Sequence, residues 1–138
     1  MLLGVIYSGR VIVPLNAVSG NAALSYVIEH SDTRVILVNE DLADKFGAVL
    51  SPLPEAVRQI PTDVDQGPQW PVAADDGAAL PPLGTDEDAI LMYTSGTTGR
   101  PKGVLLSHGN AVAGGENTAR GHDLTADDRG MCVLPLYH

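Results

Sequence analysis

The sequence has 138 residues, 44% of them hydrophobic, and its 17 acidic residues outnumber 8 basic ones to give a formal net charge of −9. This length and composition fit a globular domain. The acidic balance argues against nucleic acid as a partner, because a phosphate backbone is bound by clustered lysine and arginine. A small anionic ligand remains possible, since backbone N–H groups and one or two cations can bind it without a basic surface.

The first residues and the single cysteine bear on the cellular location of the protein. The apolar start MLLGVIYSG lacks a preceding basic residue and a convincing cleavage site, so a signal peptide is not predicted. Arg10 interrupts it well before the ~20 residues that a membrane span needs, and we predict a buried helix leading into a strand. Cys132 excludes an intrachain disulfide, and the reducing cytoplasm is the expected location.

Residues 1–50 predict alternating strands and helices. A β-branched run at 10–14 predicts a buried strand, and apolar residues at helical spacing predict a helix over about 19–31. A second buried strand is expected at 34–38, and Asn39 can cap a helix from about Glu40 to Leu50. This order predicts an α/β fold with a largely parallel sheet covered by helices.

Residues 51–87 differ in composition. Seven of the ten prolines lie between Pro52 and Pro82, and seven acidic residues with no basic one lie between Pro61 and Asp88. Acids and prolines cannot supply a core, so a solvated surface excursion is favoured over a functional acidic tail. One short strand is expected near 57–60.

Residues 88–138 predict regular structure again. A strand at 88–93 is followed by a glycine- and hydroxyl-rich loop and a second short strand at 103–106, which together predict a β-hairpin. Ser107 can cap a helix from about His108 to Arg120, where His108 is expected to be structural. A last strand is expected at 131–135.

The loop of this hairpin, TSGTTGRPKG, has the chemistry of a polyphosphate site. Its glycines let the backbone approach a ligand, its hydroxyls donate hydrogen bonds, and Lys102 adds a flexible cation. The spacing is neither the P-loop pattern nor the dinucleotide-binding G-x-G-x-x-G. Composition alone leaves a mobile turn about as plausible as phosphate binding.

The residue order resembles a known signature. T-S-G-T-T-G-x-P-K-G is similar to the phosphate-binding motif of the adenylate-forming (AMP-binding) superfamily, which includes acyl-CoA synthetases, peptide-synthetase adenylation domains and firefly-type luciferases. The likeness covers nearly the whole chain and extends to the segments GRVIVPLN, IEHSDTRV, GVLLSHGN and LPLYH. It implies that residues 1–138 are an incomplete part of the large N-terminal domain of such an enzyme, without the C-terminal domain and its catalytic lysine.

The resemblance also implies site residues. A set of loop residues would hold the ATP phosphates: Thr94, Ser95, Gly96, Thr97, Thr98, Gly99 and Lys102. Thr94 is in addition a candidate Mg²⁺ contact, and Tyr137 and His138 are candidates for the wall of the acyl pocket. No catalytic residue is assigned within this chain.

The implied reaction joins a carboxylic acid to ATP, giving acyl-adenylate and pyrophosphate, and then transfers the acyl group to coenzyme A. The LPLYH segment favours a fatty or aromatic acyl-CoA synthetase over a peptide-synthetase adenylation domain, which remains an alternative. Another alternative is an ATP- or phosphate-binding module without catalysis. By itself the 138-residue chain is expected to be inactive.

Overall fold

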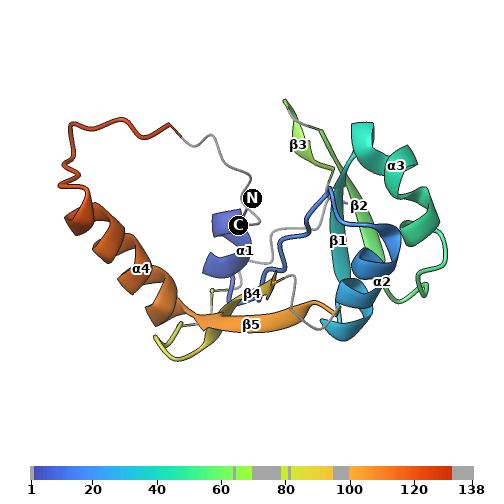
Figure 1. The fold of residues 1–138 in the computed structure, drawn as a ribbon, viewed down its shortest axis with the longest axis horizontal. Coiled ribbons are helices and arrows are strands. Elements are labelled where there is room, and N and C mark those ends of the chain that lie inside the picture. The colour runs from blue at the N-terminus through green and yellow to red at the C-terminus, as the bar shows by residue number, and fades with distance from the viewer. Residues whose placement is uncertain (1, 64, 70–78, 81, 95–99, 132–138) are drawn as a thin grey trace. The chain divides into compact units, whose positions relative to one another are not determined.

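The computed structural model describes residues 2–63, 65–69, 79–80, 82–94 and 100–131. This α/β chain contains both helices and strands, in the order labelled in Figure 1. They form two compact units: unit 1 comprises Met1–Leu15 and Ala79–His138, and unit 2 comprises Asn16–Ala78. No helix among the described residues has the length and apolar character needed to cross a membrane.

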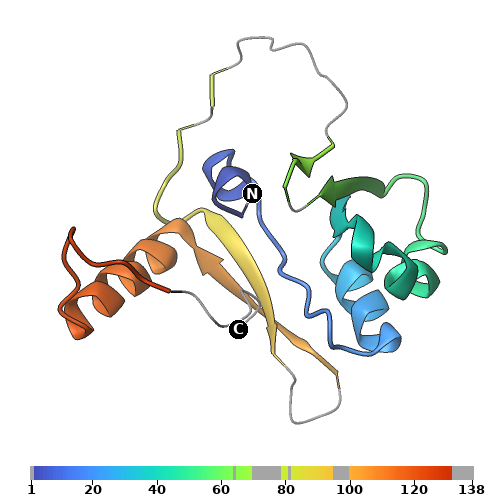
Figure 2. The same ribbon diagram turned by 90° about the horizontal axis from the view of Figure 1, so that it is seen from above.

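Unit 2 is a three-stranded sheet with helices. Its elements are α2 (Asn21–His30), β1 (Val35–Asn39), α3 (Glu40–Leu50), β2 (Arg58–Asp63) and β3 (Gly67–Pro68). The strand order is β1-β2-β3, with β1 parallel to β2 and β3 antiparallel to β2. Both ribbon views show α2 and α3 on the same side of this sheet (Figures 1 and 2).

A small apolar core holds unit 2 together. Its buried hydrophobic side chains come from both helices and from both parallel strands: Leu24, Val27, Ile28, Ile36, Val49, Leu50 and Ile60. Helix α3 begins at Glu40, as predicted, because the side chain of Asn39 accepts a hydrogen bond of 2.8 Å from the backbone N–H of Asp41 and so caps the helix. The βαβ order of β1, α3 and β2 makes the two strands parallel.

Unit 1 is built on a β-hairpin. Its elements are α1 (Leu2–Tyr7), β4 (Asp88–Thr94), β5 (Lys102–Ser107) and α4 (His108–Gly121). Strands β4 and β5 pair in antiparallel fashion, and Ile12 forms an isolated parallel bridge with Ile90 on the other edge of β4. Helix α4 follows β5 directly.

The α/β fold expected from the sequence is confirmed, with three differences of detail. Helix α1 forms, but none of its described residues is buried, whereas a buried helix was expected. The expected strand at 10–14 is reduced to the single bridge at Ile12. Strand β2 begins at Arg58 and runs three residues beyond the expected end, through Pro61, whose carbonyl oxygen accepts a 2.9 Å hydrogen bond from Gln69. Apart from Met131, the expected strand at 131–135 lies outside the described residues.

Candidate functional site

Strands β4 and β5 bring two of the predicted phosphate-binding residues together at the base of the hairpin loop. Thr94 lies directly opposite Lys102 in the antiparallel register. Opposed residues of an antiparallel pair project from the same face of the ribbon, so the threonine hydroxyl and the lysine ammonium share one face. Both residues are exposed.

The Thr94 hydroxyl is oriented by the opposite strand. Its Oγ1 donates a long hydrogen bond of 3.5 Å to the carbonyl oxygen of Lys102. With the proton directed at this carbonyl, the oxygen lone pairs remain available to accept a hydrogen bond or to contact a cation. The Mg²⁺ contact of Thr94 stays a prediction.

Strand β4, which leads into the loop, is held on both edges. One edge pairs with β5, and on the other the Ile12 N–H donates to the Ala89 carbonyl at 3.0 Å while the Leu91 N–H donates to the Ile12 carbonyl at 2.9 Å. Ala89 is fully buried at this crossing. Because β4 is paired along both edges, the strand from which the loop starts is held in place.

Gly103 has a packing role that the sequence did not reveal. It was expected to let the backbone approach a ligand, but a Cβ atom at this position would lie 3.0 Å from Leu91 Cδ1 and 3.5 Å from Tyr93 Cζ. The missing side chain leaves room for these two β4 side chains beside the backbone of β5. Gly103 therefore contributes to the packing between the two strands of the hairpin.

The N-terminus of α4 does not offer its backbone donors to a ligand. The His108 N–H donates to the Glu87 carbonyl at 2.9 Å, and the Gly109 N–H donates to the Thr85 carbonyl at 2.7 Å. The Asn110 N–H donates to Ser107 Oγ at 3.2 Å within a capping box. In this respect the chain differs from a P-loop protein, where N–H groups at the start of a helix bind the phosphates.

The rest of the predicted site lies outside the described residues. This applies to Ser95–Gly99 of the phosphate set and to Tyr137 and His138 of the acyl pocket. Among the residues that are described, no group of three or more His, Cys, Asp or Glu side chains could hold a metal ion. Sequence reasoning missed the contact of Gly109 with Thr85, since no local pattern shows which turn packs against a helix end.

Comparison with known proteins identifies the class of this α/β chain. The family model described as AMP-binding enzyme matches residues 1–138. Sulfoacetate–CoA ligase of Cupriavidus necator is 42% identical over 143 residues, which cover 100% of this chain and 28% of the ligase. Feruloyl-CoA synthase of an Amycolatopsis species is 34% identical and covers 95% of this chain and 25% of the synthase.

Solved structures agree with the sequence comparison. The crystal structure of ATP-bound MatB from Rhodopseudomonas palustris has a TM-score of 0.78 and 28% identity, covering 99% of this chain and 27% of that chain. The chain therefore belongs to the AMP-binding enzyme family, as its loop motif predicted. It spans about a quarter of the length of these relatives.

Proposed function

We propose that this chain supplies the ATP-phosphate-binding part of an AMP-forming acid–thiol ligase. The observation that carries the proposal is the opposition of Thr94 and Lys102 at the base of the loop TSGTTGRPKG. Membership of the AMP-binding family and similarity to two CoA-ligating enzymes support it.

In the proposed reaction, a carboxylate oxygen of the acid attacks the α-phosphorus of ATP and pyrophosphate leaves. The thiol of coenzyme A then attacks the acyl carbon, AMP leaves, and the acyl-CoA thioester is formed. Negative charge builds on the departing pyrophosphate, so fixed donors placed there lower the barrier.

The proposed task of the chain is to hold the β- and γ-phosphates. Lys102 supplies a mobile point charge, and the loop Ser95–Gly99 supplies hydroxyl and backbone donors. The donor set also fits Mg²⁺ carried by the nucleotide, because this ion binds through substrate phosphates and few protein oxygens, of which Thr94 offers one. Bound Mg²⁺ would neutralise part of the charge on the phosphates.

For the acid we propose a fatty or aromatic carboxylate, with Tyr137 and His138 in the pocket wall. The feruloyl-CoA synthase relative supports an aromatic acid, whereas the sulfoacetate–CoA ligase relative, which is more similar, points to a small sulfonated one. An acid panel should therefore contain ferulate, sulfoacetate and a fatty acid. The proposed location is the cytoplasm, in keeping with the lone Cys132.

Two assays on the 138-residue chain test the proposal. Isothermal titration should detect binding of ATP with Mg²⁺, because the phosphate-binding hairpin is present. ATP–pyrophosphate exchange with the acid panel should stay at background, because the family's catalytic lysine has no counterpart assigned in this chain. Absence of ATP binding would contradict the proposed phosphate site, and robust exchange would contradict the proposed inactivity of the chain alone.

A further inference from the structure

Strand β5 forms the outer edge of the hairpin sheet. The sheet has the order β4-β5, so no strand among the described residues lies beyond β5, whereas the other edge of β4 carries the bridge to Ile12. Four of the six residues of β5 are exposed. Two of them are large and hydrophobic, with exposed fractions of 43% for Val104 and 50% for Leu105. An exposed edge strand with unpaired N–H and C=O groups is a template for pairing with another strand.

The register shows which backbone groups of β5 point out of the sheet. On β4, the Leu91 N–H donates to the Ile12 carbonyl at 2.9 Å, so the peptide groups of Leu91 face away from β5. Leu91 lies opposite Leu105, and two opposed residues of an antiparallel pair either bond to each other or both point away. The N–H and C=O groups of Leu105 therefore point outwards, as do those of Gly103 two residues earlier.

Little in β5 protects this edge from pairing. Proteins usually block an exposed edge with charged side chains, proline or a β-bulge. Strand β5 has one charged residue, Lys102, which is its first, and it contains no proline. The register irregularity of the hairpin lies on β4, between Asp88 and Ile90. Both ribbon views show α4 running away from the end of β5 and not along its edge (Figures 1 and 2). Among the described residues, nothing therefore blocks the edge.

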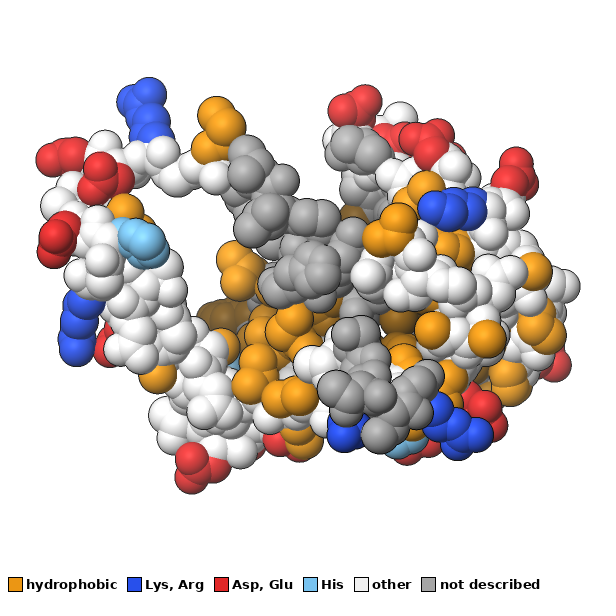
Figure 3. Space-filling model, in the orientation of Figure 1, with side chains coloured by type: hydrophobic (Ala, Val, Ile, Leu, Met, Phe, Trp, Pro, Cys, Tyr) orange, Lys and Arg blue, Asp and Glu red, His pale blue; other side chains and the backbone are white. Residues whose placement is uncertain are grey.

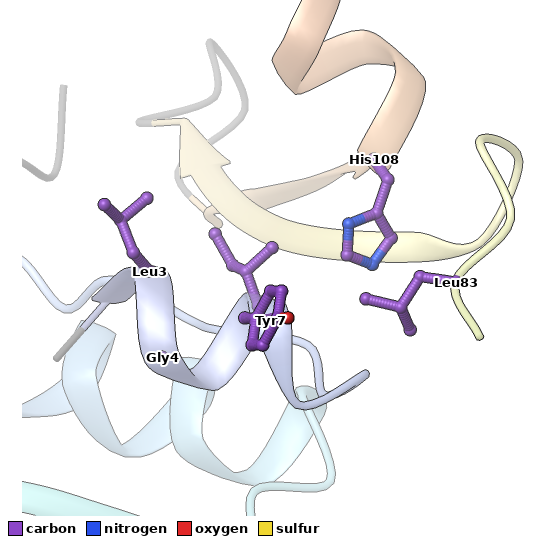
Figure 4. A pocket seen from close by; sticks show the side chains of 6 residues that line it. Leu3, Gly4, Tyr7, Leu83 and His108 are labelled. Atoms are coloured by element: carbon purple, nitrogen blue, oxygen red, sulfur yellow. The ribbon is translucent and has the colours of Figure 1, made fainter. Parts of the chain in front are cut away.

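Apolar surface accompanies the edge. Hydrophobic side chains are visible at the lower centre of Figure 3, in the region where β5 runs in Figure 1. An open depression of about 450 Å³ is a different surface of unit 1, because none of its lining residues belongs to β5: Leu3, Gly4, Ile6, Tyr7, Leu83 and His108. Figure 4 shows this depression, with Tyr7 of α1 and His108 of α4 labelled. Leu3 therefore serves as a control position outside the edge.

We propose that β5 is a self-association edge, on which a second copy of this chain pairs antiparallel through its own β5. The strands β4 and β5 of both copies would then form one continuous antiparallel sheet. In the proposed register, Gly103 of each copy lies opposite Leu105 of the other, so that the outward N–H and C=O groups of both residues are all bonded. A strand that pairs antiparallel with its own copy gives a closed two-fold dimer.

The side chains of β5 suit this register. Its two-fold axis passes between the two copies of Val104, and apolar side chains directly opposite one another stabilise an antiparallel pair. Leu105 of each copy lies opposite Gly103 of the other, on the face where Leu91 and Tyr93 fill the space beside this glycine. The pairing would therefore bury the two exposed hydrophobic side chains of β5 along with its free peptide groups.

The distribution of charge favours a second copy at this edge. Unit 1 contains seven acidic and five basic residues, a net charge of −2, so unit 2 carries most of the net charge of −9. Strand β5 has no acidic residue, and the proposed register places the two copies of Lys102 at opposite ends of the paired strands. The repulsion that remains between two chains of net charge −9 is screened by salt.

Sedimentation of the 138-residue chain over a range of concentrations tests the proposal. We expect a reversible monomer–dimer equilibrium that shifts towards the dimer as NaCl is raised from about 0.05 to about 0.5 M. The exchange of the Leu105 N–H with solvent, followed by NMR, should slow as the dimer forms, because this group would donate to the second copy. The proposal is overturned if the chain stays monomeric at about 1 mM in high salt, or if exchange of the Leu105 N–H does not depend on concentration. Either result would mean that another segment of the chain, or water, covers the edge.

Val104→Lys is the disrupting variant, and Val112→Lys in α4 is its matched control. The two side chains are 43% and 63% exposed, both lie in unit 1, and both substitutions change the net charge equally. Val104→Lys would place two ammonium groups opposite each other, so dimerisation should weaken at least about tenfold. Val112→Lys should change it less than about twofold. Equal effects of the two substitutions would contradict an interface at β5.

A mixing experiment separates loss of the interface from loss of the fold. Val104→Glu alone should weaken dimerisation as Val104→Lys does, because two carboxylates would then oppose each other. An equimolar mixture of the two variants should form a heterodimer, since residue 104 of each copy then faces the opposite charge, and an unfolded variant could not be rescued in this way. Failure of the mixture to dimerise would overturn the proposed register. A dimer of the wild-type chain that Leu3→Asp dissociates would overturn it as well, because Leu3 lies outside β5.

Discussion

The contact between α4 and the turn before β4 leaves no room for a side chain at Gly109. A Cβ atom there would lie 2.9 Å from the backbone oxygen of Thr85 and 3.4 Å from its Cβ atom. The Gly109 N–H also donates to this same oxygen at 2.7 Å. Since the oxygen belongs to the backbone, Gly109→Ala must move the helix end or the turn.

The expected cost follows from these distances. Overpacking of this kind costs about 1–3 kcal/mol, and a weakened hydrogen bond adds up to about 1 kcal/mol. The better helix propensity of alanine returns at most about 1 kcal/mol. We therefore expect Gly109→Ala to lower the free energy of unfolding by about 1–3 kcal/mol.

Gly115→Ala in the same helix is the matched control. Nothing lies within 4 Å of the position where its Cβ would be, so the substitution should raise stability by about 0.5–1 kcal/mol. Both variants are measured by urea unfolding of the 138-residue chain, with circular dichroism as the signal. Equal or greater stability of Gly109→Ala relative to Gly115→Ala would show that the turn at Thr85 is not packed against α4 as described.

Two further predictions concern caps and turns. Asn39→Ala should destabilise the chain by about 1 kcal/mol in urea unfolding, because the side chain caps α3 through Asp41, whereas Asn39→Asp should preserve most of the stability. In the exposed turn after α4, the Asp128 carboxylate accepts the Thr125 N–H at 2.6 Å and the Thr125 hydroxyl at 2.9 Å, and these bonds hold the pKa of Asp128 below its ordinary value. Because the pKa of Asp128 is lower in the folded state than in the unfolded state, these bonds stabilise the folded state at pH values above the ordinary pKa of aspartate. This stabilisation is lost as the pH falls through the folded-state pKa. Thr125→Ala removes the hydroxyl donor and keeps the backbone N–H, so the pKa of Asp128 should rise part of the way towards its ordinary value in an NMR titration, and an unmoved Asp128 would contradict the contribution assigned to the hydroxyl.

Interactions between residues that are close in sequence made much of this fold predictable. The cap at Asn39 and the box at Ser107 start α3 and α4 where expected, because the side chain that begins each helix lies next to it in sequence. The hairpin was predictable from two apolar runs around a glycine-rich loop, whereas the pairing of Thr94 with Lys102 was not, because both residues were expected in the loop. The family followed from the order of residues in that loop.

Other features depend on contacts between distant segments, which no local pattern encodes. The run at 10–14 looks like a full strand, but only Ile12 bridges to β4. Gly103 looks like part of a ligand-binding loop, yet its lack of a side chain makes room for Leu91 and Tyr93. The concentration of buried side chains in unit 2 could not be predicted either, since α1, β4 and β5 of unit 1 are also apolar in sequence, although α4 is polar.

The central claim is that the hairpin loop with Lys102 binds the phosphates of ATP, and a titration of three proteins tests it most directly. The sequence contains two lysines, Lys102 in the hairpin and Lys45 in α3, so Lys102→Ala and Lys45→Ala change the net charge equally. A charge-assisted hydrogen bond to phosphate contributes about 1.5–3 kcal/mol. Calorimetric titration with Mg-ATP should show binding weakened about 10- to 100-fold by Lys102→Ala and nearly unchanged by Lys45→Ala. Equal affinities of the two variants, or binding that survives Lys102→Ala undiminished, would contradict the account.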